Sequence, residues 1–425
     1  MLRDIGDILS LYIQPLPLLV MYYGLTTVMG GLIISRRFVS LRRDPMAGSF
    51  IGFGAALLGF GIPGIYAVYQ LTPAKTLGLV DETSTEDVQF RFDSNVLWGM
   101  GAFGFLWILL TILAANTEPS RFLVVVSGGV YRGMLIFLVA AGLSIIFGLM
   151  DVLNFAQGSL FMVGAYVAWE VYRELGDWRE TSLGLASAFV IALIAATVVG
   201  TILGLIMEVL FIRPTYSRPF FQVVLTFGLA LILREYAISR YGPAALFNVD
   251  LRFPDGSPTI FTGLFPGTSI QNYWIFMSVI GFIMIFGVQY LLQNTRIGII
   301  IRAGVQDSDM VEALGINVRL IFTLVFALGA AIAALGGAVA SGFLAPNPDI
   351  GDQFLLQAIA VVIVGGLGSY SGTAVASIVL GITGAIASHF ALVEYSSDAL
   401  GSTSILIILL IVLYIKPTGL FGRAH

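Results

Sequence analysis

Apolar runs of about 20 residues recur from one end of this chain to the other, a length that lets a helix cross the roughly 30 Å hydrocarbon core of a bilayer. The runs are continuous and do not alternate at the two-residue period of a barrel strand. Only 11% of the residues are charged, which is less than half of the roughly 25% found in soluble domains. The sequence therefore predicts an all-α, polytopic helical membrane protein.

About 11–12 membrane segments are expected from the lengths of these runs. The candidate spans are 15–35, 46–70, 96–115, 133–149, 155–172, 184–210, 220–239, 272–293, 320–343, 352–368, 373–391 and 402–415. Basic residues gather in 36–43, 213–219, 296–319 and the tail after Lys416, whereas 71–95, 241–271, 344–352 and 392–401 are acidic or polar. The positive-inside rule places the first group, with the C-terminus, in the cytoplasm. This alternation fails near the N-terminus, where either 122–132 contains a further partial crossing or one early segment does not span.

Several kinds of chemistry are excluded by residue inventory. The only lysines, Lys75 and Lys416, stand outside any G-x-x-x-x-G-K-[ST] loop, so the chain carries no P-loop ATPase. The only histidines, His389 and His425, do not form an H-E-x-x-H motif. There is no cysteine, hence no thiolate metal site or cysteine nucleophile. We expect a chain without cofactor, metal site, nucleic-acid partner or enzymatic activity.

The stretch V-L-N-F-A-Q-G-S-L at 152–160 interrupts an otherwise apolar region. Asn154 and Gln157 are spaced to share one helix face, and Gly158 suits a helix start. Transporters place such breaks where irregular backbone lines a pathway. Alternatively, the amides join one helix to another, at about 0.6–2 kcal/mol for each hydrogen bond. The neighbouring Asp151 is solvated at a helix end or paired with an arginine such as Arg132, and a proton or ion site is the third alternative.

The segment from Arg302 to Arg319 is the most informative loop. Asp307, Met310, Ala313 and Leu314 fall at i, i+3, i+6 and i+7, so a short helix there is amphipathic. Gly315 is a plausible C-terminal cap, with Ile316 packing back beyond it. Such a helix either docks a partner or lies on the membrane interface.

Three other patterns have simpler interpretations. Glu208 and Arg213 predict a local salt bridge near the end of a span. Small residues at 329, 333, 337 and 341 form a ridge typical of close helix packing. The glycine-dense G-G-L-G-S-Y-S-G at 365–372 predicts a tight hairpin, with a pathway-lining role as the alternative.

Four stretches together resemble the permease subunits of branched-chain amino acid ABC importers, and are most similar to the first of the two permeases in that system. They are G-L-M-D-V-L-N-F-A-Q-G-S-L-F-M-V-G-A-Y-V-A (148–168), M-E-V-L-F-I-R-P (207–214) with L-T-F-G-L-A-L-I-L (225–233), R-A-G-V-Q-D-S-D-M-V-E-A-L-G-I-N (302–317), and V-V-I-V-G-G-L-G-S-Y-S-G with the closing K-P-T-G-L-F-G-R. Gln306 stands where the family often has an acid, and Asp151 where it often has glycine or arginine. The resemblance covers roughly 125–425, so the division is a permease core at 121–425 and an N-terminal extension at 1–120 with about three spans.

The resemblance implies a role for each motif. A broken helix near 150–158 lines or gates the pathway, through Asn154, Phe155, Ala156, Gln157 and Gly158. The loop that couples to the ATPase contains Arg302, Ala303, Asp307, Met310, Leu314, Gly315, Ile316 and Asn317. Structural motif positions are Glu208, Arg213, Pro214, Gly365, Gly366, Gly368 and Ser369.

The same resemblance implies partners and a location. They are two ATP-binding subunits that hold ATP and Mg, a second homologous permease in a heterodimer or a homodimer, and an extracytoplasmic substrate-binding protein that docks on 241–271 and 344–352. The expected location is the cytoplasmic membrane of a prokaryote, and the expected cargo is a branched-chain or related amino acid. Three alternatives remain: the same machinery carrying urea, short amides or other polar amino acids, an ATP-independent secondary transporter or channel, and a membrane scaffold.

Overall fold

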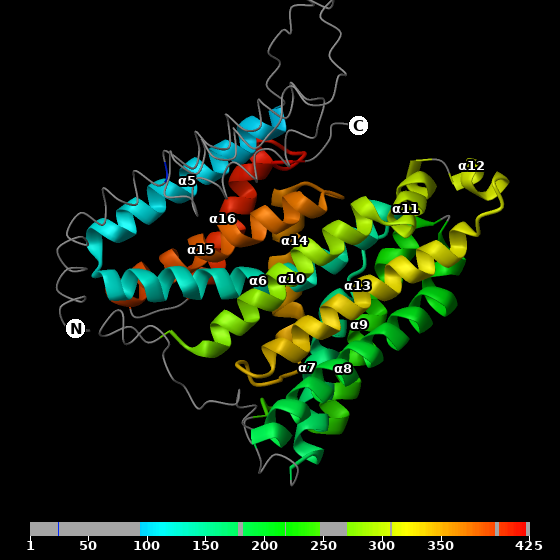
Figure 1. Cartoon of the computed structure of the whole chain (residues 1–425), viewed down its shortest axis with the longest axis horizontal. Coiled ribbons are helices and arrows are strands. Elements are labelled where there is room, and N and C mark those ends of the chain that lie inside the picture. The colour runs from blue at the N-terminus through cyan, green and yellow to red at the C-terminus, as the bar shows by residue number, and fades with distance from the viewer. Residues whose placement is uncertain are drawn as a thin grey trace, which may run out of the picture. The chain divides into compact units, whose positions relative to one another are not determined.

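The computed structural model describes residues 24, 94–176, 182–216, 218–246, 270–306, 308–395 and 399–421. All regular structure within these residues is helical (Figure 1). The longer helices are α5 (Ser94–Asn116), α6 (Pro119–Met150), α7 (Gln157–Glu174), α8 (Ser182–Met207), α9 (Pro219–Tyr241), α10 (Asn272–Asn294), α13 (Val318–Ala340), α14 (Ile350–Gly365), α15 (Tyr370–Tyr395) and α16 (Ala399–Ile415). The shorter ones are η2 (Glu208–Ile212), η3 (Arg213–Thr215), α11 (Arg296–Gln306) and α12 (Ser308–Ala313). The predicted all-α class is confirmed.

Most of the predicted spans that the structure describes coincide with apolar helices; the exception is 155–172, where α7 is in neither group of the helices that follow. Among the described residues, 6 helices are long and apolar enough to cross a membrane, and three shorter apolar helices end at Asn116, Gly365 and Ile415. Each of the predicted spans from 96–115 onward contains a helix. The predicted spans 15–35, apart from Gly24, and 46–70 lie outside the described residues.

α6 resolves one alternative left open near the N-terminus. Residues 122–132 belong to this single continuous helix of 32 residues, so they form no separate crossing. The described residues group into two compact units, of which the first contains α5 with the start of α6 and the second contains the remaining helices. The division into an N-terminal extension at 1–120 and a core at 121–425 stays a prediction.

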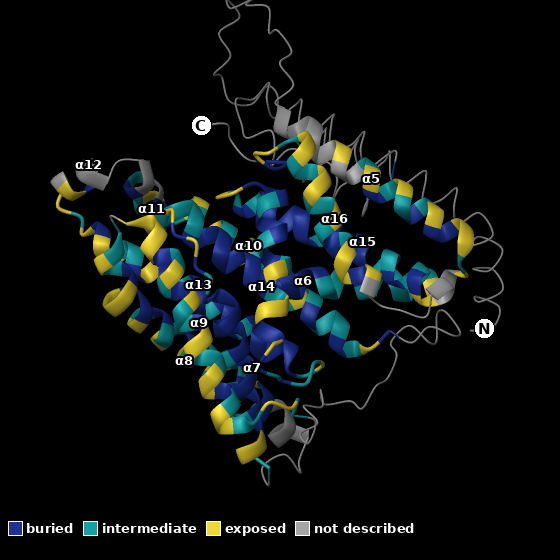
Figure 2. Ribbon diagram, turned by 180° about the vertical axis from the view of Figure 1, so that it is seen from behind, coloured by how far each residue is buried: buried dark blue, intermediate teal, exposed yellow. Residues whose placement is uncertain are grey.

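The second unit is organised around α13, which packs closely against α7 and α8. Its small residues allow this approach, as the ridge pattern predicts. A Cβ atom on Gly337 would overlap the Phe161 carbonyl oxygen of α7, and one on Gly204 of α8 would overlap the Ala330 side chain. Figure 2 shows the result, with buried residues gathered on α6, α7 and α13 and exposed residues along the outer side of α8 and α9.

Candidate functional site

The interruption between α6 and α7 covers residues 151–156, as the sequence predicts. Asp151 follows the last turn of α6 with φ at +54°, a left-handed conformation that Asp tolerates better than most residues. Its side chain is exposed. Arg132 instead donates to Ser402 Oγ of α16 at 2.9 Å. Since α6 is continuous from Arg132 to Met150, these two residues lie about 28 Å apart at 1.5 Å per residue, and the alternative of an Asp151–Arg132 pair is wrong.

Asn154 closes the turn that leads into α7. Its Oδ1 accepts from the Ala156 N–H at 3.1 Å, and its main-chain oxygen accepts from the Gln157 N–H at 3.3 Å. Asparagine commonly makes such local side-chain bonds where a helix starts. The side chain is fully buried, so these bonds satisfy a polar group that water does not reach.

Gln157 connects this turn to α13. Its Oε1 accepts from Asn154 Nδ2 at 3.1 Å, and its Nε2 donates to the Gly329 main-chain oxygen at 2.8 Å. The Gln157 side chain is also fully buried. Both amides therefore have partners within the protein, and these contacts favour the joining of helix to helix, which was the second interpretation of the sequence.

α9 forms the other side of the break. Thr226 Oγ1 accepts from the Phe155 N–H at 3.2 Å and lies 3.4 Å from the Leu153 main-chain oxygen. One turn further along, Ser159 Oγ donates to the Ala230 main-chain oxygen at 3.3 Å. The irregular backbone between α6 and α7 is thus bonded to α9 on one side and to α13 on the other.

Glycines let the surrounding backbones meet at the break. Gly142 of α6 faces Gly329 of α13, and a Cβ on Gly142 would overlap both Gln157 Nε2 and the Gly329 oxygen. Gly158 and Gly351, each in the first turn of α7 and α14, face one another in the same way. The Gln157 side chain reaches Gly142, about two turns before the end of α6, and the first turn of α7 is buried throughout. The N-terminus of α7 therefore lies deep within the bundle.

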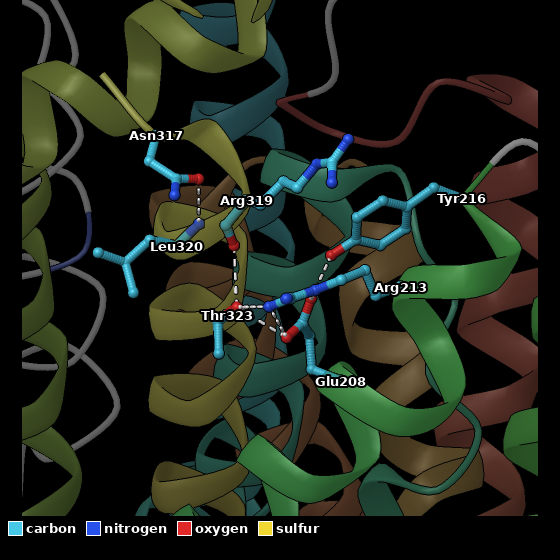
Figure 3. A network of polar contacts seen from close by, with 7 residues as sticks. All are labelled: Glu208, Arg213, Tyr216, Asn317, Arg319, Leu320 and Thr323. Atoms are coloured by element: carbon cyan, nitrogen blue, oxygen red, sulfur yellow. Dashed lines mark hydrogen bonds and ion pairs between the residues drawn. The ribbon is translucent and has the colours of Figure 1, made fainter. Parts of the chain in front are cut away.

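A second polar cluster surrounds Glu208, which is fully buried and follows directly after α8 (Figure 3). Arg213 donates to both carboxylate oxygens, at 3.2 Å from Nε and 3.0 Å from Nη2. The Tyr216 hydroxyl donates to Oε1 at 2.6 Å, and Thr323 Oγ1 of α13 lies 2.7 Å from Oε2. Arg213 Nη2 also donates to Thr323 Oγ1 at 2.6 Å. The predicted local salt bridge is present, and it extends to a helix more than a hundred residues away.

The backbone that carries Glu208, Arg213 and Tyr216 is irregular helix. Residues Glu208–Ile212 form a π-helical turn, a rare element that often marks functional positions. Pro214 lies in the 3₁₀ turn that follows, where its missing N–H costs little. Burial and the hydrogen bond to Glu208 raise the pKa of the Tyr216 phenol. The contribution of Tyr216 to stability is therefore complete below about pH 10, the pKa of tyrosine in the unfolded chain. It is lost as the pH rises through the higher pKa of the folded state.

The loop before α13 contains the predicted short helix. α12 ends at Ala313, and Gly315 follows with φ at +84°. The Gly315 and Ile316 N–H groups donate to the Glu312 and Val311 oxygens at 2.9 and 3.3 Å, so the predicted glycine cap is confirmed. Asn317 Oδ1 then accepts from the Leu320 N–H at 3.2 Å and caps the start of α13.

The apolar residues of this loop are exposed. Met310 is 58% and Leu314 72% exposed, whereas Val311 is buried. Ala303 is half-buried within α11. Asp307 and the Arg302 side chain lie outside the described residues.

The comparisons with known proteins decide the family. Residues 125–414 match the family model described as the permease component of branched-chain amino acid transport systems. The chain belongs to this permease family. It is the permease component of an ABC-type importer and a multi-pass membrane protein, and in this family partner subunits bind ATP.

The relatives of this permease are named as branched-chain amino acid transport proteins. LivH of Salmonella typhimurium is 27% identical over 305 residues, which cover 69% of this chain and 94% of that protein. BraD of Pseudomonas aeruginosa shows the same identity and coverage over 305 residues. A probable LivH of Methanocaldococcus jannaschii is 26% identical over 306 residues, with 70% and 92% of the two chains covered. No solved structure matches the chain.

The glycine-dense segment of the permease is a hairpin, as predicted. Gly366 and Gly368 have φ at +101° and +77° and connect α14 to α15, while the Ser369 N–H donates to the Gly366 oxygen at 2.9 Å. The chain end packs here as well: the Leu420 N–H donates to the Val364 oxygen at 2.8 Å and the Phe421 N–H to the Gly365 oxygen at 3.2 Å.

Several residues of these sites were missed from the sequence. Tyr216 could have been predicted as a partner of Glu208, because it lies only eight residues further along the chain, at the end of the same helical segment. Thr226, Thr323 and Gly329 each lie at least 70 residues from their partners, and a single sequence gives no signal for such pairs.

Proposed function

We propose that this chain is the permease subunit of an importer that moves branched-chain amino acids across the cytoplasmic membrane of a prokaryote. The family match over residues 125–414 carries the proposal. The relatives named above support the cargo, since their match covers nearly their whole length. The chain itself catalyses no reaction, and two ATP-binding subunits, a second permease and a substrate-binding protein complete the importer.

The break at 151–156 is the proposed gate of the pathway. Asn154 and Gln157 hold the break in shape through their mutual bond and the bond to Gly329. Phe155 and Ala156 lie within the break, and Gly158 lies in the first turn of α7 against Gly351. Irregular backbone at this depth is tolerated because it is buried in protein or lines a cavity. A displacement of α9 or α13 changes the contacts of the break directly, and access then alternates around it.

Cargo is tested by transport. We expect the importer, reconstituted in vesicles with its partner subunits, to take up labelled leucine when ATP is present, and valine and isoleucine to compete. The expectation follows from the family, whose relatives carry that cargo in their names. Measuring the same uptake in the presence of excess urea separates the alternatives. Competition by urea with none by isoleucine would contradict the amino-acid assignment and favour a urea or amide importer.

The loop containing α11 and α12 is the proposed contact with the ATP-binding subunits, on the cytoplasmic side. Its exposed apolar side chains, Met310 and Leu314, suit a protein partner. We expect Leu314→Asp to abolish co-purification of the ATPase, because a charge would be buried in that contact. The folded yield should stay unchanged, since the side chain is 72% exposed.

The control for this loop is Leu400→Asp. Leu400 is 45% exposed at the start of α16. The charge pattern places this end of α16 on the outer side, so the same change is made on the proposed opposite side of the membrane. Equal loss of the ATPase in both variants, or none in Leu314→Asp, would contradict the coupling assignment. Gly315→Pro is a second variant, because proline cannot adopt φ at +84°.

A further inference from the structure

α13 touches both polar clusters and also the proposed coupling loop. It begins directly after the cap residue Asn317, three residues beyond Gly315. Thr323 on its second turn contacts Glu208, and Gly329 accepts the Gln157 hydrogen bond at 2.8 Å. These two positions are about 9 Å apart along one helix, at 1.5 Å per residue. A displacement of the loop is therefore carried by a single rigid element to the break.

α9 provides a second connection from the same cluster. Arg213 and Tyr216 lie in the segment that joins α8 to α9. Gln222 Nε2 of α9 donates to the Thr215 oxygen of that segment at 2.9 Å. One turn later, Thr226 bonds Phe155 and lies near Leu153 on the other side of the break. Gln222 and Thr226 are both buried.

Glu208 lies where these two connections meet (Figure 3). Its carboxylate is bonded to Arg213 and Tyr216 on the α9 side and to Thr323 on the α13 side. These bonds are directional and short, so they fix distance and orientation, whereas an apolar contact lets helices slide. A buried ion pair is poor evidence for added stability alone, and its better-attested use is to specify one arrangement.

We propose that Glu208, Arg213, Tyr216 and Thr323 form a positioning cluster that makes α13 and the α8–α9 connection move as one body, so that motion of α12 reaches both sides of the 151–156 break together. The proposal rests on the proposed function, because it assigns a role to residues of the same importer. It gives the cluster a part in coupling and not only in folding. None of the four residues contacts cargo or ATP in this scheme.

The first experiment measures leucine taken up per ATP hydrolysed by the complete reconstituted importer. Thr323→Val keeps the shape of the side chain and removes its hydroxyl, and Tyr216→Phe removes one bond to Glu208. We expect each variant to lower uptake per ATP by about fivefold or more, the lower end of coupling between sites, while ATP hydrolysis continues. Thr323→Ser restores the hydroxyl and should restore the ratio.

Thr383→Val is the matched control. Thr383 is also buried, and its hydroxyl donates to Val379 of its own helix at 2.8 Å. The uptake ratio of this variant should equal that of the unaltered importer. A normal ratio in both Thr323→Val and Tyr216→Phe, or an equal loss in Thr383→Val, would overturn the proposal. If Thr323→Val does not fold, Tyr216→Phe alone decides.

The second experiment separates this proposal from the choice of cargo. The chain has no cysteine, so spin labels can be attached at Leu324→Cys on α13 and Phe227→Cys on α9, both exposed positions. The mean distance between the labels should be the same with and without ATP. In Tyr216→Phe the distribution of distances should broaden. A distance that changes with ATP in the otherwise unaltered importer would overturn the proposal. Failure to import leucine would leave this measurement intact and count only against the cargo.

Discussion

Replacing Gly142 by alanine is expected to abolish uptake and to destabilise the permease by about 3 kcal/mol or more, the upper part of the range for overpacked cores. The added Cβ would overlap Gln157 Nε2 and the Gly329 oxygen, and it would lie 3.1 Å from the Gly329 carbonyl carbon. The amide could rotate away only by giving up its bond to Gly329. The oxygen belongs to the backbone of α13, so α6 and α13 would have to separate. The thermal unfolding midpoint in detergent and uptake in vesicles both measure this effect.

Gly287→Ala in α10 is the control for this change. A Cβ built at Gly287 meets nothing within 4 Å. Alanine is also the better helix former by roughly 0.8–1 kcal/mol, so this variant should be as stable as the parent or slightly more so. Unchanged stability and uptake in Gly142→Ala would show that α6 and α13 are further apart than the described geometry, and the proposed shape of the break would be lost with it.

The elements that the sequence predicted correctly depend on neighbouring residues. Long apolar runs set the helices, since hydrocarbon leaves few other solutions for a spanning chain. Gly315 and its cap follow from the amphipathic turn just before them, and Asn154 with Gln157 marks the break by polarity alone. In each case the residues that form the pattern lie within about two helical turns of the feature that they predict.

Contacts between distant segments were not predictable in this way. The salt bridge between Glu208 and Arg213 was predictable because only five residues separate them. No pattern in the sequence indicated that Thr323 is a further member of this cluster. Likewise, the roles of Asn154 and Gln157 stayed open until their partners were known. Gly329 belongs to a ridge that the sequence identified as a packing surface, yet its main-chain oxygen is what accepts the Gln157 bond. Backbone acceptors have no signature in a residue pattern.

Arg213→Met should produce the second large effect, a loss of about 3–5 kcal/mol of stability. This is the usual cost of leaving one member of a buried ion pair without its partner. The Glu208 side chain is 0% exposed, whereas that of Arg213 is 33% exposed, so removing the arginine leaves a charge with no access to water. Tyr216 and Thr323 would remain as donors, but neither neutralises the carboxylate. Thermal unfolding in detergent measures the loss.

Two further variants decide whether the buried charge is the cause. Arg213→Met combined with Glu208→Gln should recover most of the lost stability, because the amide is neutral and its oxygen still accepts from Tyr216. Arg240→Met removes an arginine from a more exposed pair with Glu170, whose two side chains are 55% and 25% exposed. Such pairs contribute about 0–1 kcal/mol, so this variant should be nearly as stable as the parent. If the double variant were no more stable than Arg213→Met, packing of the arginine side chain would be the important term, and the carboxylate would not need its cation.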